Sequence, residues 1–165
     1  MVLPKFFQQD LNSMVLKCKP GVKYQMDAGI KLLYTFTADM DTTICACCSG
    51  LSYENCCKPF HQHRSVPATA EALMRSRYCA YALHLTDYLV ETTHKSQRHL
   101  HAKKSIKEWA VANTWLKLEI CDTAPNIVEF KAYYQNGLQL YIHHERSTFK
   151  FESGKWYYVS GQFFD

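Results

Sequence analysis

The chain has 165 residues, a hydrophobic content of 47%, an aromatic content of 14% and a formal net charge of +4 at pH 7. This length is enough for one domain with a core and a small metal module beside it, and the composition excludes general disorder. The charge is too mild to indicate nucleic-acid binding by itself, and no apolar run approaches the roughly 20 residues that span a bilayer.

Residues 1–43 mix short apolar runs with turn-forming residues and show neither helical nor strand periodicity. We treat this segment as an unassigned N-terminal extension. Met40 would also be a sensible start for the part of the chain that follows. The N-terminus lacks the basic, apolar, small-residue order of a secretory signal, so we expect a reducing, cytoplasmic location.

The stretch 45–63, CACCSGLSYENCCKPFHQH, holds five of the eight cysteines. Two close cysteine pairs flank the turn-forming Ser49-Gly50, so four thiols can meet across a small loop. The pairs are Cys45 with Cys47 and Cys56 with Cys57. This spacing is typical of a tetrahedral zinc knuckle.

Four cysteine ligands would complete the tetrahedron and leave no position for a catalytic water, so the predicted ion is a structural zinc. Three neighbouring side chains are reserve ligands: Cys48, His61 and His63. Disulfides between the close cysteines are the alternative, which an oxidising compartment would favour.

The segment after the cysteine cluster has the pattern of one main helix that runs from about residue 70 to residue 93. Thr69 is the expected N-cap, and Glu71 suits the first turn. Apolar side chains recur at three- and four-residue steps, which predicts one buried stripe. They are Met74, Tyr78, Tyr81, Leu85 and Leu89.

Residues 94–107 form a connection that is rich in basic residues and histidine, without interleaved aromatic side chains, so we expect a solvated surface. Contact with phosphate or nucleic acid is the weaker alternative. A short second helix follows, with Ser105 as its predicted cap and Ile106, Trp109 and Ala110 on one face.

The rest of the chain predicts an antiparallel sheet. Segments 115–121, 127–134, 138–151 and 155–160 are expected strands, and Asn136-Gly137 and Ser153-Gly154 are expected turns. Helices followed by an antiparallel meander predict an α+β fold. A curved sheet that closes on a long helix would form a cone, whose mouth can bind a ligand.

Polar and aromatic side chains are candidates for the lining of this cone. They are Arg75, Arg77, Tyr78 and Tyr81 on the helix and Tyr134, His144 and Arg146 on the sheet. Strand alternation puts His144 and Arg146 on one face and His143 and Glu145 on the other, so these neighbours do not form one constellation. We predict no catalytic residue, since no nucleophile–base pair is recognisable.

The segment CACCSGLSYENCC resembles the SEC-C motif, the zinc module of the tail of the SecA translocation ATPase. With the later blocks LMRSRYCAY, EWAVANTWLKLEI, HERSTF and GKWYYVSG, the chain resembles the YchJ family of uncharacterised bacterial proteins from about Ile44 to Gly161. This resemblance implies a SEC-C knuckle at 44–66 and a domain similar to nuclear transport factor 2 at 67–165.

Within the motif, Cys45, Cys47 and Cys56 match the first three ligands, and Cys57 stands where the motif has histidine or cysteine. Cys48 replaces the usual glycine, which adds a thiol beside the site.

The expected function is a non-catalytic binding or adaptor module that presents the knuckle to a protein partner. By analogy with the SecA module, this partner is a chaperone or the ribosome. The alternative is a small-molecule-binding protein or enzyme that uses the cone pocket. A third hypothesis is nucleic-acid contact through residues 95–107 together with the knuckle.

Overall fold

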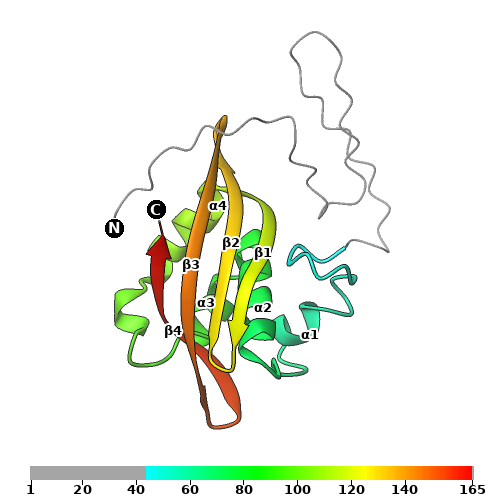
Figure 1. Cartoon of the computed structure of the whole chain (residues 1–165), viewed down its shortest axis with the longest axis vertical. Coiled ribbons are helices and arrows are strands. Elements are labelled where there is room, and N and C mark those ends of the chain that lie inside the picture. The colour runs from blue at the N-terminus through cyan, green and yellow to red at the C-terminus, as the bar shows by residue number, and fades with distance from the viewer. Residues whose placement is uncertain (1–43, 165) are drawn as a thin grey trace.

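The computed structural model describes residues 44–164, and the predicted extension at 1–43 lies outside them (Figure 1). The helices are α1 (Lys58–His61), α2 (Ala70–Ala82), α3 (Thr86–Glu91), the 3₁₀ turn η1 (Arg98–Leu100) and α4 (Lys103–Ala112). The strands are β1 (Thr114–Ala124), β2 (Ile127–Asn136), β3 (Gln139–Glu152) and β4 (Lys155–Phe164). Helices precede strands throughout, so the predicted α+β class is confirmed.

The strands form one antiparallel sheet in the order β1-β2-β3-β4, as expected for a meander. Both predicted turns are present. The β2–β3 loop has its positive φ at Gly137 (+58°), and the β3–β4 loop has positive φ at Ser153 (+52°) and Gly154 (+77°). Such turns match the twist of the strands, which explains why glycine occurs in each.

Helices α2, α3 and α4 cover one face of the sheet, and Figure 1 shows the strands in front of them. The core between these layers is rich in aromatic side chains. The Trp109 ring lies 4.8 Å from Trp115 and 5.8 Å from Tyr134 between centroids, both in edge-to-face contact. Burying one such side chain stabilises the fold by roughly 1.5–3 kcal/mol, so these rings fill space that the cone would otherwise leave open.

The predicted main helix is two helices, and this part of the prediction was wrong. Its start is as expected, since Thr69 Oγ1 accepts a hydrogen bond from the Ala72 N–H at 3.0 Å. The helix ends because His84 adopts a φ of +58° and the Leu85 N–H donates to the Ala80 carbonyl at 2.8 Å. This is a Schellman cap with histidine in the position where glycine is usual, and side-chain periodicity does not reveal it.

The second predicted helix is present as α4, but its start differs. It begins at Lys103 after Ala102, without a side-chain cap, so Ser105 lies inside the helix. No side chain of the N-cap residue accepts a hydrogen bond from the first turn, so no sequence signal marks this boundary.

Candidate metal centre and the interior of the cone

The knuckle, which we define as residues 44–66, folds back on itself through a tight loop. The Cys45 N–H donates to the Leu51 carbonyl oxygen at 2.8 Å. Between them, Cys48 and Gly50 have φ values of +61° and +84°. This left-handed backbone reverses the chain within a few residues, at little cost for glycine. The loop thereby places its cysteines beside the start of α1.

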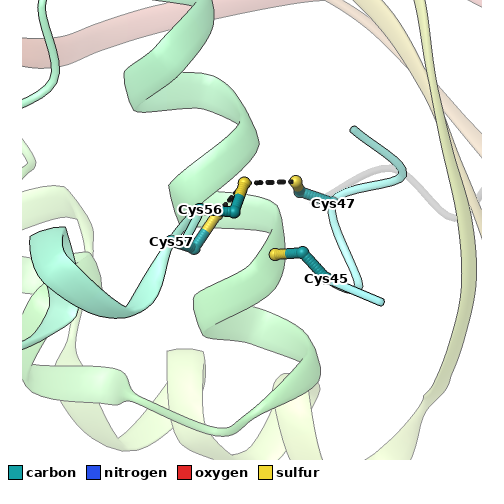
Figure 2. Close-up of side chains that lie close together, drawn as sticks. All are labelled: Cys45, Cys47, Cys56 and Cys57. Atoms are coloured by element: carbon teal, nitrogen blue, oxygen red, sulfur yellow. Dashed lines mark hydrogen bonds between the residues drawn. The ribbon is translucent and has the colours of Figure 1, made fainter. Parts of the chain in front are cut away.

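Four sulfur atoms converge where the loop meets α1 (Figure 2). The Sγ atoms of Cys45, Cys47, Cys56 and Cys57 all lie within 4.8 Å of one another. Cys47 and Cys56 are 3.5 Å apart, and Cys56 and Cys57 are 3.8 Å apart. A tetrahedron with zinc–sulfur bonds of about 2.3 Å has edges of about 3.8 Å, so this spacing suits one tetrahedral ion. All four residues are free thiols, whereas the alternative required disulfides.

The electrostatics of the cluster favour a shared cation. Hydrogen bonds from Cys47, Cys57 and Cys79 lower the pKa of Cys45, despite its burial. The hydrogen bond to Cys45 in turn raises the pKa of Cys47 to about 12, and burial acts in the same direction. The protein alone thus favours one thiolate and opposes a second beside it. Only a cation held by all four sulfurs would keep them deprotonated together.

A fifth thiol, which the motif did not predict, reaches the cluster from α2. The Sγ of Cys79 is buried and lies 3.7 Å from that of Cys45, 34 residues away along the chain. One turn earlier, the Arg75 guanidinium donates to the Cys47 carbonyl at 3.0 Å. These contacts fasten the knuckle to α2. Tertiary packing alone brings Cys79 here, so no local spacing could have revealed it.

The interior of the cone holds a second buried group of polar side chains, centred on Glu145 of β3. This residue is only 5% exposed. Ser147 donates to Glu145 Oε1 at 2.5 Å, and His143 Nε2 lies 2.7 Å from Oε2. Burial acts to raise the pKa of Glu145, but the hydrogen bonds from His143, Ser147 and Tyr158 outweigh it and hold this pKa below its usual value.

Gly161 on β4 leaves the room that this carboxyl group occupies. A Cβ at position 161 would lie 2.0 Å from Glu145 Oε1. Nearby, the Arg77 guanidinium lies 4.8 Å from the centroid of the Tyr158 ring and donates to the Leu89 carbonyl at 2.8 Å. Arg77 therefore links α2 to α3 and to the sheet from a buried position.

Two solved structures are similar to this chain in fold and sequence. A SEC-C motif containing protein from Rhodopseudomonas palustris aligns with a TM-score of 0.68 at 38% identity, covering 73% of this chain and 98% of that protein. A sec-c motif containing protein from Psychrobacter arcticus aligns with a TM-score of 0.64 at 34% identity, covering 73% and 81%.

Sequence relatives agree with the structures. A "UPF0225 protein" of Actinobacillus succinogenes is 40% identical over 124 residues, which span 72% of this chain and 80% of the relative. A Haemophilus influenzae UPF0225 protein is 44% identical over 120 residues, spanning 70% and 75%. Residues 69–161 match the family model described as "YchJ, middle NTF2-like domain". The chain belongs to the YchJ family. The family predicted from the sequence motifs is thus confirmed, and the four-cysteine cluster of its SEC-C motif suggests a metal site.

The reserve ligands lie outside the four-sulfur cluster of this YchJ-family chain. His61 Nε2 donates to the Ser76 carbonyl at 2.9 Å, and its Nδ1 accepts from the Tyr53 hydroxyl at 2.9 Å, so both ring nitrogens are engaged. His63 is exposed. The sulfur of Cys48 accepts a hydrogen bond from the β1 backbone at 3.4 Å.

The candidate cone residues divide between three places. Arg77, Tyr78, Tyr81 and Tyr134 lie in the interior, among the core rings and the Glu145 group. Arg75 lies against the knuckle instead. His144 and Arg146 lie on the outer face, where both contact Glu129. The structure thus does not bring the seven residues to one pocket, because β3 alternates between its two faces.

A shallow depression follows the seam between the knuckle and the NTF2-like domain. Its lining includes the apolar side chains of Phe60, Val66, Pro67 and Trp156 and the charged side chains of Glu91 and Lys155. Val66 is 50% exposed there. Among residues 44–164, no helix is long and apolar enough to cross a membrane.

Proposed function

We propose that this YchJ-family protein is a non-catalytic adaptor whose knuckle binds a structural Zn²⁺ and presents a surface to a protein partner. The observation that carries the proposal is the mutual spacing of four free thiols within 4.8 Å. Four thiolates close a tetrahedral ion and leave no coordination position for a substrate. Zinc would then stabilise the fold of the knuckle and hold its surface in place.

The depression at the seam is the part of this surface best suited to a partner. It combines an exposed apolar side chain, Val66, with charges of both signs at Glu91 and Lys155. An extended partner segment with one apolar anchor and polar flanks fits such a groove. Because the groove is formed by the knuckle and the domain together, it would depend on the zinc-bound fold.

The partner is proposed by analogy alone. The SEC-C resemblance to the SecA tail points to a chaperone or the ribosome, and the free thiols of the four-sulfur cluster suit the cytoplasm. The nucleic-acid hypothesis is less favoured. Lys95 pairs with Glu152 at 3.2 Å and Lys103 pairs with Asp87, so acidic side chains already offset part of this basic segment.

Binding of a small molecule in the cone is the second candidate function. The buried Glu145–His143 pair favours it, since a carboxylate beside an imidazole can recognise or deprotonate a polar ligand. The aromatic rings of Trp109, Trp115 and Tyr134, which pack across the interior, oppose it.

Metal analysis of the full chain, purified under reducing conditions, tests the zinc site. We expect one tightly held equivalent of zinc, lost in Cys45→Ser/Cys47→Ser. Cys79→Ala is the matched control, since it removes a buried thiol near the cluster but outside the four ligands. Less than about half an equivalent in the wild type would contradict the zinc assignment.

Affinity capture from cell extract tests the adaptor. Proteins retained by the wild type should be lost with Cys45→Ser/Cys47→Ser and with Val66→Asp. Leu138→Asp, at a 98% exposed position on the β2–β3 hairpin, should retain them. If every partner survives both the double cysteine variant and Val66→Asp, the knuckle is only a scaffold and the adaptor proposal fails. Capture that collapses with added salt would instead favour the nucleic-acid hypothesis.

A further inference from the structure

The outer face of the sheet, opposite the helices, carries a second group of metal-binding side chains. Cys121 of β1, Glu129 of β2 and His144 of β3 each offer one donor atom, and the three atoms lie within 4.8 Å of one another. We propose that these side chains form a surface site for a divalent transition ion, with Zn²⁺ as the expected occupant. We call this group the outer-face site. It does not depend on the function proposed for the knuckle.

A β-bulge brings the thiol into the group. The register passes from Ile120 opposite Phe130 to Asp122 opposite Glu129, so Cys121 is an extra residue in β1. A bulge interrupts the strict alternation of side chains and redirects them. Cys121 and Asp122 consequently both approach the outer face near Glu129. The backbone ladder of three neighbouring strands then holds the three donor residues together.

The imidazole and the carboxylate are already oriented for a common ion. His144 Nε2 lies 2.9 Å from Glu129 Oε1, and a metal ion would take the place of the proton between them. Glu129 Oε2 lies 3.1 Å from the Arg146 guanidinium, and this contact fixes the orientation of the carboxylate. Residues that hydrogen-bond to metal ligands commonly orient them in this way. The Phe164 ring lies against His144 with centroids 4.5 Å apart, which restricts rotation of the imidazole.

The donor chemistry selects the class of ion. A thiolate, an imidazole and a carboxylate suit Zn²⁺ and its neighbours better than Mg²⁺ or Ca²⁺, which prefer oxygen donors alone. Bonds of about 2.0–2.3 Å place tetrahedral donors about 3.3–3.6 Å apart, which small side-chain rotations would achieve. Three protein ligands leave a fourth position for water, so this site is open where the knuckle is closed.

The surrounding charges predict a weaker site than the knuckle. The Cys121 thiolate and the Glu129 carboxylate together balance a divalent ion, but Lys131 and Arg146 add positive charge nearby. Burial also raises the pKa of Cys121, so metal binding must displace a proton from this thiol. Zinc occupancy should therefore fall as the pH is lowered.

The test is a zinc titration of the full chain, first loaded with one equivalent and stripped of loose metal, in competition with a chromophoric zinc indicator. Cys121→Ser and His144→Ala should each lower the affinity for a second equivalent of zinc by at least about tenfold. His99→Ala, at an exposed histidine of the connecting segment, is the matched control and should leave this affinity unchanged.

Cobalt substitution shows by absorption whether a thiolate is a ligand, which a count of bound metal equivalents does not. The second equivalent of Co²⁺ should show a thiolate-to-metal absorption that Cys121→Ser abolishes, while the absorption of the first equivalent persists. The outer-face site should still bind Co²⁺ in Cys45→Ser/Cys47→Ser. This result would distinguish loss of the outer-face site from loss of the knuckle site. The proposal is overturned if the wild type binds no second equivalent of metal. It is also overturned if that equivalent survives both outer-face variants or is equally lost in His99→Ala.

Discussion

The knuckle and the Glu145 group are both buried clusters of ionisable side chains, but they differ in how their charges are compensated. The knuckle gathers four thiols from residues 45–57, and the hydrogen bond between Cys45 and Cys47 lowers the pKa of the first and raises the pKa of the second. The Glu145 group draws one carboxyl and its donors from two strands, and internal hydrogen bonds satisfy it. The four thiols therefore suggest a site for an added ion, whereas contacts within the fold compensate the Glu145 carboxylate.

Removal of metal should produce the largest difference between the knuckle and the Glu145 group. A structural zinc site contributes on the order of 10 kcal/mol of apparent binding free energy, most of it spent on local folding. Chelation at neutral pH should therefore abolish amide-exchange protection in residues 44–66 and leave β2 and β3 protected. Hydrogen exchange by mass spectrometry measures both regions in one sample. Equal loss of protection in both would mean that the cone also depends on the ion.

Gly161→Ala should disturb only the cone. The new Cβ would lie 2.0 Å from Glu145 Oε1, and the carboxyl group cannot move aside without leaving Ser147 and His143. We expect a loss of about 3 kcal/mol in the free energy of unfolding, measured by urea denaturation. Metal content should not change.

Gly154→Ala is the matched control for this substitution. Its Cβ would meet no atom within 4 Å, and only the φ of +77° opposes it. The expected cost is about 1 kcal/mol. An equal cost at both glycines would show that the close approach to Glu145 is unimportant.

The smallest expected effect concerns the pH dependence that Glu145 contributes. Its folded-state pKa is held below the usual value, so the ionised form adds stability above the unfolded pKa of about 4.3. That contribution disappears as the pH falls through the lower folded-state pKa. Glu145→Gln should thus be less stable than the wild type at pH 7, and urea midpoints at successively lower pH should converge. A gap independent of pH would contradict this assignment.

Much of the framework follows from local sequence signals. The turn residues Asn136-Gly137 and Ser153-Gly154, the alternation of the strands and the Thr69 cap are short-range features, and each predicts what is observed. The four clustered thiols lie within 13 residues, so their spacing alone indicates a common site. Predictions that depend on neighbours in sequence therefore succeed.

Features that depend on tertiary packing could not be predicted from the sequence. The contact of Cys79 with Cys45 and that of Gly161 with Glu145 each join residues more than ten positions apart. The end of α2 at Ala82 depends on His84, a left-handed residue that is not glycine. His144, which the sequence groups with the cone candidates, lies on the outer face beside Glu129, because alternation alone does not reveal which face of β3 turns inward.

Helix α2 touches both clusters from opposite sides. Arg75 and Cys79 face the knuckle, whereas Arg77 and Tyr81, offset by two positions, face the interior of the cone. A substitution in this helix that changes its packing against one cluster therefore also changes its packing against the other. A rotation or shift of this helix that suits one cluster disturbs the other, so evolution of the knuckle surface and evolution of the cone interior are constrained together through thirteen residues.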